Sequence, residues 1–460
     1  MFRSIVNTFS NCFKIPELKS RIIFTVVVLA ICRLTAYIHI PGLDSAALMK
    51  AFDDASHNGS GGPLGMLGAF SGGAIQNCAI GALTIIPYIS ATIIIQLLTA
   101  VVPQLSKMAR EEGGRAKIIQ YGRYLTVLLC LGQGLFTAIG YEHPEAVLGV
   151  KIDRLVLYPD SWIWWYRIQT TIVLTAGTML LMWLGEQITD RGIGNGVSLI
   201  ITINILSRLP QAVIGVKDMF FPGDAGVHAN YGQAILLLGL LAFVIAGIIA
   251  VTQAQRKIPV TYAQRAVGRK VFAGGTNYMP LRVNYAGVMP VIFAQSILMF
   301  PQKIAQTIGK SYNLKFFIDI ANYLNEGAFL YIMVFSLLIL FFSYFWVATQ
   351  FNELQIADDL KKNGGYIPGV RPGQATSDYL HNTMSRITLA GAIFLVIISV
   401  IPILMGKVMH IQWTVYQFFG GTSMLIAVGV MLDTMRQMES HLLMRHYDGF
   451  LKKGRLKGRF

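Results

Sequence analysis

Ten apolar stretches alternate with polar connections along this chain of 460 residues. Most are near the length of about 20 residues that an α-helix needs to cross the hydrocarbon core of a bilayer. Long apolar runs without alternation favour helices over a membrane barrel, because backbone groups in lipid must find their partners within the segment. The pattern predicts an all-α polytopic membrane protein with ten transmembrane helices, at residues 22–40, 75–102, 124–141, 168–185, 194–207, 232–252, 284–302, 327–348, 387–406 and 412–432.

The distribution of charge predicts the orientation of these spans. When the chain is threaded alternately through a membrane, the side that holds the N-terminus receives most of the 38 Lys and Arg residues, whereas Asp and Glu divide almost evenly. A bias in Lys and Arg alone places both termini, and the large loops at 253–283 and 349–386, in the cytoplasm. Much of the net charge of +15 is therefore an orientation signal. The surplus in the large loops suggests an anionic partner such as ribosomal RNA, anionic lipid or an acidic protein surface.

A glycine-rich segment, residues 59–73, separates the first two spans. It is too apolar for an ordinary exposed loop, and too short and glycine-rich to span the bilayer. Broken backbone at membrane depth is tolerated where protein surrounds it, so we expect a re-entrant segment. Composition alone also permits a flexible exterior loop.

The second and seventh spans share the pattern Pro-x-Ile-x-Ala, at residues 87–91 and 290–294. The two copies lie five spans apart, and an odd number of spans per half inverts the second half relative to the first. Three identities could arise by chance, but their placement favours two inverted five-helix halves. The predicted organisation is an N-terminal segment 1–21, a first half 22–215, a second half 216–432 and a basic cytoplasmic tail 433–460.

Sequence motifs for catalysis, metal binding and ion coupling are absent. Spans two to ten contain no charged residue, whereas ion-coupled carriers need acids or histidines at membrane depth. We find no phosphate-binding loop, HExxH motif or nucleophile elbow. The cysteines, Cys12, Cys32, Cys78 and Cys130, fit no metal spacing and are interpreted as small apolar residues without a disulfide. We therefore expect no enzyme, cofactor or metal, but a conduit or scaffold that another component drives.

A few polar residues lie within the apolar spans. Arg33, in the first span, costs at least a few kcal/mol unless it is paired or hydrated. It either holds a helix interface or faces a water-filled cavity, or it snorkels to a surface because the span is misplaced. Gln96, Gln133 and Gln295 should seek partners across helix interfaces, either as static packing or along a seam that can separate.

Several long motifs resemble the SecY family, the central subunit of the bacterial protein-conducting channel, in the same order and over essentially the whole chain. They are residues 70–75 (FSGGAI), 85–98 (IIPYISATIIIQLL), 181–196 (LMWLGEQITDRGIGNG), 280–294 (PLRVNYAGVMPVIFA), 363–373 (NGGYIPGVRPG) and 418–426 (FFGGTSMLI).

The resemblance implies a pore between the two halves, hinged between spans five and six. A plug at about residues 61–73 would close the exterior side, and spans two and three would meet seven and eight at a lateral gate. The implied plug residues are Leu64, Met66, Leu67 and Phe70. The implied pore ring is Ile85, Ile89, Val197, Ile201, Ile292 and Ile426, with Val197 where the family often has isoleucine. The implied gate residues are Ser90, Gln96, Gln133, Gln295 and Phe300.

The resemblance also implies partners and a location. Arg256, Lys257, Arg265 and Arg371 match docking sites for the ribosome and the SecA motor. It further implies small SecE-like and SecG-like membrane subunits as partners and unfolded preproteins as substrates. The implied location is the bacterial cytoplasmic membrane. A ring of branched aliphatic side chains agrees with it, because a narrow apolar constriction dewets and blocks ions without binding the passing chain.

Two other functions fit the sequence less well than a channel. A secondary solute carrier would need the coupling residues that the spans lack. A membrane scaffold or insertase subunit would need neither a plug nor a separable gate.

Overall fold

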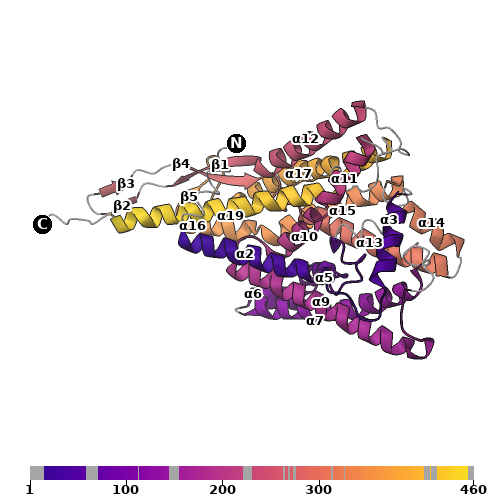
Figure 1. Cartoon of the computed structure of the whole chain (residues 1–460). Helices are drawn as coiled ribbons and strands as arrows, with labels where there is room; N and C mark the ends of the chain where they lie inside the picture. The colour runs from indigo at the N-terminus through magenta and orange to yellow at the C-terminus, as the bar shows by residue number, and fades with distance from the viewer. Residues whose placement is uncertain are drawn as a thin grey trace.

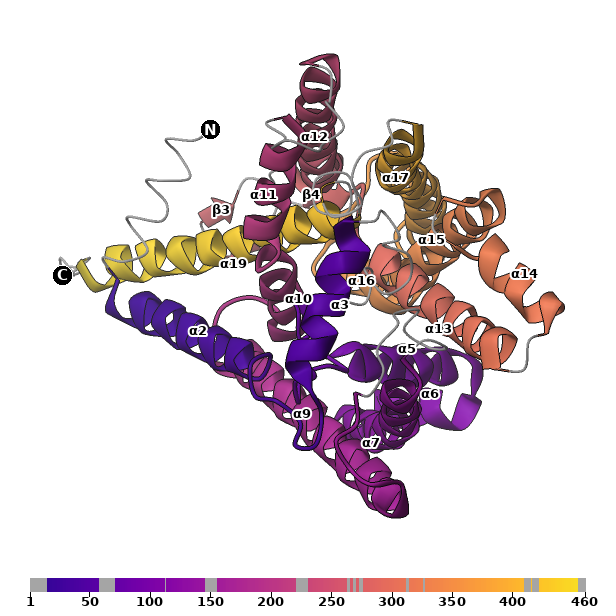
Figure 2. The ribbon, with the colours of Figure 1, turned by 45° about the vertical axis from the view of Figure 1, so that its right-hand side comes forward.

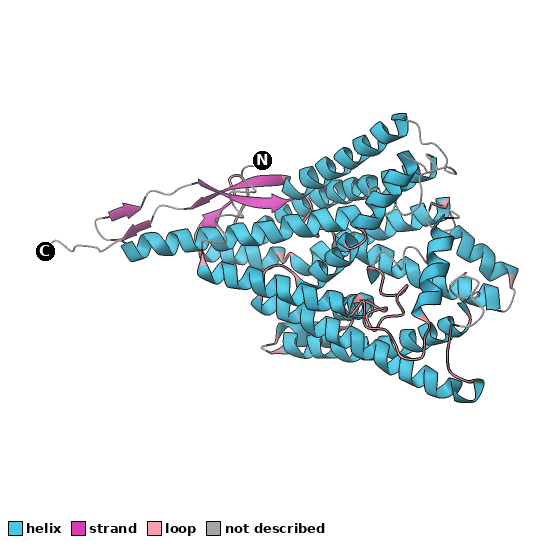
Figure 3. Cartoon of the chain, viewed as in Figure 1, coloured by secondary structure: helices cyan, strands magenta, loops and turns pink. Residues whose placement is uncertain are grey.

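The computed structural model describes residues 15–57, 71–111, 113–144, 155–220, 231–262, 265–267, 270–272, 276–311, 314–325, 327–408, 415 and 422–453. Helices dominate it (Figures 1 and 3). Those of the first half are α2 (Pro16–Leu34), α3 (Ser45–His57), α5 (Ile86–Val101), α6 (Pro103–Arg110), α7 (Gly114–Glu142), the 3-10 helix η1 (Asp160–Trp162), α9 (Ile163–Arg191), α10 (Gly196–Leu206) and α11 (Leu209–Phe220). Those of the second half are α12 (Tyr231–Gln253), α13 (Met289–Ser311), α14 (Lys315–Tyr323), α15 (Phe329–Gln350), α16 (Glu353–Lys362), α17 (Gln374–Val408) and α19 (Thr422–Lys453).

Six helical stretches among the described residues are long and apolar enough to cross a membrane, or seven if the bent pair α5 and α6 counts as one. They are formed by α7, α9, α10 with α11, α12, α15 with α16, and α17. Pro103 begins α6 after a bend of 103°. The remaining predicted spans correspond to α2, α13 and α19, in which polar and charged residues shorten the apolar run: α2 ends next to Arg33, and α13 is interrupted by Pro301.

The predicted start of the second span is wrong, because residues 72–85 form turns and α5 begins only at Ile86. Several of these residues have positive φ, including Cys78 at 46° and Thr84 at 57°, which no helix accommodates. The backbone of this stretch bonds instead to the chain after α2, with Ile40 N donating to Cys78 O at 2.8 Å. The connection from the glycine-rich segment to α5 is therefore attached to the first span.

The two large loops are joined by a small sheet, an exception to the all-helical prediction. Strand β1 (Gln255–Tyr262) pairs antiparallel with β4 (Thr276–Arg282) over the register Gln255↔Arg282 to Thr261↔Thr276. Its other edge pairs with β5 (Gly365–Tyr366), about a hundred residues later in the chain. Strands β2 (Arg265–Val267) and β3 (Lys270–Phe272) extend the hairpin. Ile258, Val260 and Ile367 bury their side chains in one apolar cluster, so the loops form a single unit.

Figure 1 separates the two ends of the molecule. The strands, α16, the beginning of α2 and the end of α19 lie at one end, whereas α3 and α14 lie at the other. In Figure 2, α5, α7 and α9 form one side and α12, α15 and α17 the other, with α10 and α13 between them. The predicted basic tail is helical as far as Lys453, because α19 continues beyond the predicted span. The largest buried apolar cluster has members from both sides.

Candidate functional site

Helix α10 reaches the centre of the molecule through the turn after α9. The Asn195 side chain caps α10, with Ser198 N donating to its Oδ1 at 3.2 Å. A Cβ on Gly196 would lie 1.9 Å from Gly185 O, so only glycine lets α9 and α10 approach this closely. This turn positions Val197 and Ile201 one helical turn apart, as their spacing predicts.

Helix α5 brings the second pair of ring residues. Ile85 immediately precedes the helix, and Ile89 N donates to Ile85 O at 3.1 Å, so the two residues stack across the first turn. Pro87 occupies that turn, where its missing N–H costs no helical hydrogen bond. Ile85 is 1% exposed and Ile89 is 6% exposed, which places this face of the helix inside the protein.

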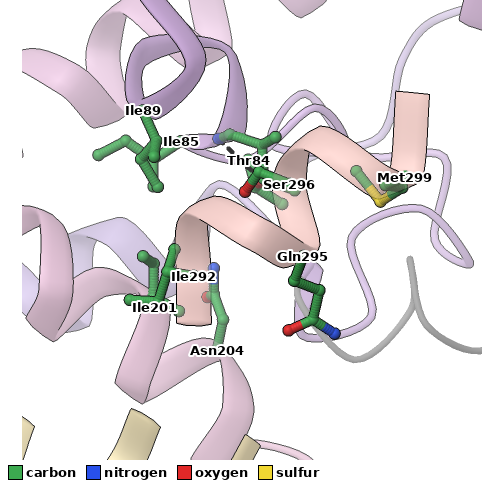
Figure 4. Close-up of a pocket in the computed structure, with 10 residues that line it drawn as sticks. Thr84, Ile85, Ile89, Ile201, Asn204, Ile292, Gln295, Ser296 and Met299 are labelled. Atoms are coloured by element: carbon green, nitrogen blue, oxygen red, sulfur yellow. Dashed lines mark hydrogen bonds between the residues drawn. The ribbon is translucent and has the colours of Figure 1, made fainter. Parts of the chain in front are cut away.

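Four of the six predicted ring residues line one small cavity at the meeting point of α5, α10 and α13. Ile85 and Ile89 face Ile201 and Ile292 across it (Figure 4). Its volume is about 20 Å³, which holds roughly one water molecule. Ile426 is fully buried and Val197 half-buried in the same apolar cluster. The structure thus places four of the six residues around one cavity and the other two in the same large apolar cluster, and the role of all six in a pore stays a prediction.

Polar side chains complete the lining of this cavity. Asn204, Thr84 and Ser296 were missed by the sequence analysis, whereas Gln295 was selected. Asn204 carried the same signal as the selected glutamines, since it is an uncharged amide within an apolar span. Thr84 could not have been found, because its position depends on a backbone turn that the apolar pattern concealed.

Helices α5 and α13 meet at the seam that was predicted to be a lateral gate, flanked by α7 and α15. Gln295 accepts a hydrogen bond from Thr422 Oγ1 at 2.8 Å, which ties α13 to α19. The buried atoms Ser90 Oγ, Gln96 Oε1 and Gln133 Nε2 have no hydrogen-bond partner among the described residues. Each unsatisfied buried polar atom lowers stability by about 1–3 kcal/mol, so these side chains add little to the stability of the seam. Phe300 belongs to α13, but its side chain lies outside the described residues.

The predicted docking residues belong to the unit that the sheet builds from both loops. Arg256 and Lys257 are exposed on β1. Arg371 is exposed in a turn held by Val370 N donating to Ile367 O at 3.0 Å and by Thr376 Oγ1 donating to Arg371 O at 2.9 Å. Arg265 lies in β2, and its side chain is not among those described.

Arg33 holds a helix interface, as one of the two interpretations predicted. Its guanidinium donates to Asn204 Oδ1 and to Gly72 O, each at 3.1 Å. The plug residues Leu64, Met66, Leu67 and Phe70 lie outside the described residues, but Gly72 belongs to the end of the predicted plug. Arg33 therefore connects α2, α10 and the end of the glycine-rich segment.

A second, larger cavity lies where α10 begins. Its volume is about 470 Å³, and residues from α10, α19 and the connection between β4 and α13 line it. The polar lining includes Asn195, Ser198, Arg282, Asp433, Arg436 and Gln437. Arg436 also donates to Thr252 O, which ties α19 to the end of α12.

Metal and disulfide chemistry find little support in the part of the chain that is described. That part contains no group of three His, Cys, Asp or Glu residues placed to hold a metal ion. Cys32, Cys78 and Cys130 are buried free thiols, as their apolar surroundings predicted.

These features define a polytopic membrane protein whose helices pack around a small apolar cavity. The SecY family model matches residues 79–435. "Protein translocase subunit SecY" of Chlamydia trachomatis is 41% identical, over 98% of this chain and 99% of that protein. The chain therefore belongs to the SecY family, whose members are channel subunits and not enzymes.

Solved channel structures share the fold. One is a SecY translocation channel whose plug domain stabilises the closed state and maintains a membrane seal. It has a TM-score of 0.59 at 16% identity, with 92% of each chain covered. Sec61 in the canine ribosome-channel complex has a TM-score of 0.55 at 16% identity, with 92% of each chain covered. The predicted fold class, an all-α membrane protein of ten transmembrane helices in two inverted halves, is confirmed by this likeness.

Proposed function

We propose that the chain is the channel subunit that passes unfolded preproteins across the bacterial cytoplasmic membrane and releases transmembrane segments sideways into it. A motor or a translating ribosome supplies the driving force. The observation that carries the proposal is the convergence of four aliphatic residues, from both halves of the chain, on one cavity with room for roughly one water, with Val197 and Ile426 in the same buried apolar cluster. Its relatives' designation as protein translocase subunits agrees with this function.

The ring serves as the seal around a passing chain. Branched aliphatic side chains offer water and ions no hydration partner, so the closed constriction stays dry. The same side chains form no hydrogen bonds with a polypeptide, so unrelated sequences can slide past. The plug, at about residues 61–73, closes the exterior side as a second seal.

The seam between α5 and α13 serves as the lateral gate. Ser90, Gln96 and Gln133 contribute buried polar atoms that bond to no other described residue, so little hydrogen bonding is lost when the helices around them separate. Gln295 and Phe300 lie on α13, across the seam from α5. A transmembrane segment can then leave the pore through the helices that line it.

The joined loops serve as the docking surface for anionic partners. Arg256, Lys257 and Arg371 project from one packed unit, and Arg265 follows in the same hairpin. Fixed arginines suit contacts with phosphates or carboxylates. We assign to this surface the ribosome, which is bound to the Sec61 channel solved with it, the SecA motor and anionic lipid. SecE-like and SecG-like subunits complete the assembly.

The orientation follows from the charge distribution. The beginning of α2, the end of α19 and the joined loops lie at one end of the molecule, which we assign to the cytoplasm (Figure 1). We assign residues 22–215 and 216–432 to the two halves, 1–21 to an N-terminal segment and 433–460 to a basic tail. Single cysteines at Lys270 and Lys361 should resist an impermeant thiol reagent added to intact cells. Labelling of either from outside would overturn this topology.

Photo-crosslinking tests the translocation pathway. A photoreactive amino acid replaces Ile89 or Ile292 in proteoliposomes that contain the chain, its SecE-like subunit and the motor. A preprotein arrested in transit should crosslink at both positions. Leu337, which is 66% exposed on α15, gives the matched control. Equal crosslinking at Leu337, or none at the ring positions, would contradict the proposed pathway.

A further inference from the structure

Helix α14 is a short helix between two longer ones, α13 and α15, and it contacts both. Its nine residues rise about 14 Å, less than half the thickness of the hydrocarbon core of a bilayer. The helix lies at the end of the molecule opposite the strands, outside α13 and α15 (Figures 1 and 2). It therefore cannot cross a membrane and must lie at or beyond its surface.

Two exposed faces of α14 differ in chemistry. One face is polar, with the exposed residues Lys315, Asp319 and Asn322 at helical spacing. Phe316 and Tyr323 share the neighbouring face, at positions i and i+7, and they are 70% and 62% exposed. An aromatic face beside a polar one is typical of a helix at the boundary between lipid and water.

A third face of α14 packs tightly against the end of α13. A Cβ on Gly309 of α13 would lie 2.9 Å from the backbone N and from a side-chain carbon of Ile318, so a larger residue would force the two helices apart. Leu314 N donates to Gly309 O at 3.1 Å, just before α14 begins. The end of α13 and helix α14 therefore form one fixed corner.

An exposed apolar stripe begins on α15 shortly after α14 ends. Its members recur at every fourth position and are more than half exposed: Phe329, Met333, Leu337 and Phe341. Because α15 belongs to a stretch long and apolar enough to cross the membrane, this stripe faces lipid. Phe329, at the start of α15 next to α14, is the most exposed at 83%, so lipid reaches the level of α14.

We propose that α14 binds the lipid–water interface of the exterior leaflet through Phe316 and Tyr323, and thereby fixes the depth of the exterior end of α13. The choice of leaflet rests on the orientation proposed above, and the effect on α13 deepens the proposed gate, on which it rests. An aromatic ring enters the edge of the apolar layer, and the tyrosine hydroxyl still bonds to water there.

Lipid fits this surface better than a second protein chain. Aromatic side chains bury roughly 150–250 Å² each, so two of them fall short of the approximately 800 Å² that a stable interface needs from each partner. The charges beside them, Lys315 and Asp319, have opposite signs and give a partner no net charge to match. An interfacial helix requires only that its apolar side reach the acyl boundary.

Spin labels on α14 test the contact with lipid. Phe316→Cys, Tyr323→Cys and Asp319→Cys are labelled singly in a chain without its native cysteines, reconstituted with its SecE-like subunit into lipid vesicles. Collisions of each label with oxygen, which concentrates in lipid, are compared with collisions with a water-soluble nickel chelate. The ratio of oxygen to nickel collisions should be several-fold higher at Phe316 and Tyr323 than at Asp319.

Two exposed leucines calibrate this ratio. Leu337, on the stripe of α15, reports lipid, and Leu354, on α16 beside the joined loops, reports water. We expect Phe316 and Tyr323 to resemble Leu337. A ratio like that of Leu354 would place the helix in water, and few collisions with both reagents would mean that protein covers it. Either result would overturn the inference, and Tyr323→Cys decides alone if Phe316→Cys fails to assemble.

A label on α13 tests the anchor. Ile304 is exposed on α13, before the corner with α14. Phe316→Ser with Tyr323→Ser removes the aromatic contact, so nickel collisions at Ile304→Cys should rise several-fold as the end of α13 shifts toward water. Lys315→Ser with Asn322→Ser, on the polar face, is the matched control and should leave the label unchanged. No change in the aromatic variant, or equal changes in both variants, would overturn the anchoring of α13.

These measurements need no translocation, so they separate the inference from the function on which it rests. Failed lipid contact beside normal preprotein crosslinks at Ile89 and Ile292 refutes only the role of α14. Absent crosslinks beside lipid-bound aromatic residues refute the proposed pathway and leave the lipid contact of α14 standing.

Discussion

The two cavities of this protein differ in size, lining and charge although the same two helices line both. The cavity of the ring measures about 20 Å³ and is lined by isoleucines with a few uncharged polar groups. The cavity at the beginning of α10 measures about 470 Å³ and is lined by charged groups, including Arg282, Asp433 and Arg436. Helix α10 contributes Ser198 to the polar cavity and Ile201 to the apolar one.

The comparison indicates how thin the seal is. Ser198 and Ile201 are separated by a rise of about 4.5 Å along the helix. Helix α13 changes over the same interval, from Met289 in the polar cavity to Ile292 in the apolar one. The lining therefore changes from polar to apolar within about one turn of each helix, so the apolar layer exposes little surface to a passing chain. The layer can still block ions, because it offers them no hydration partner.

The largest effect should come from making the dry cavity resemble the polar one. Ile292→Asn and Ile426→Asn bury an amide that lacks partners in the closed channel, at a cost of about 1–3 kcal/mol that opening relieves. We expect a leak about tenfold or more above the parent and secretion of preproteins with defective signal sequences. Leu337→Asn, on an exposed face of α15, is the control. Parent-like conductance and secretion would place Ile292 and Ile426 in packed core or against lipid.

Removing the second seal leaves the ring to act alone. Deletion of residues 64–70 should give a stable channel that translocates but leaks ions at rest. A glycine-rich segment gains little from packing and has high entropy when released, so its loss costs the fold little. Neighbouring residues can partly refill the seat, so planar-bilayer recordings should show an intermittent leak. A tight channel would mean that the segment is an ordinary exterior loop.

A substitution on the proposed docking surface should affect the motor and leave the seal intact. Arg371→Glu reverses the charge of an exposed, fixed turn and should reduce motor-dependent export several-fold, because an anionic contact becomes repulsive. Resting conductance and membrane assembly should match the parent. Export at the normal rate with normal expression would remove Arg371 from the docking surface.

The smallest effect should arise at the seam. Thr422→Val removes the hydrogen bond to Gln295 and leaves the amide unsatisfied, a change of about 1 kcal/mol. Export of a preprotein with a weakened signal sequence should rise by a few-fold. Thr434→Val serves as the control, because Thr434 Oγ1 donates within its own helix, to Val430 O. Equal effects of both variants would assign the contact to local helix stability.

The sequence predicted what depends on local spacing. Ile85 and Ile89, or Val197 and Ile201, lie one turn apart on helices, so their shared face follows from periodicity. Arg33 had to find partners, because an isolated charge among apolar residues is costly. Its partners Asn204 and Gly72 could not be deduced, since both depend on how distant segments pack.

The pairing of distant strands and the irregular backbone could not be predicted either, because both depend on how distant segments pack. Strand β1 pairs with β5, which lies four helices further along the chain and contains only two residues. Residues 72–85 are apolar enough to suggest a helix, yet positive φ at Cys78 and Thr84 holds them in turns. Contacts with the end of α2 stabilise that backbone, and no local pattern reports them.

Water access along α10 tests the central claim most directly. Single cysteines at Ser198 and Ile201, in a chain without its native cysteines, are exposed to a charged thiol reagent from the cytoplasmic side. Ser198→Cys should react in the resting channel, whereas Ile201→Cys should react only when an arrested preprotein holds the pore open. Equal reaction at both positions in the resting channel, or protection of Ile201→Cys throughout translocation, would contradict a thin dry seal at this ring.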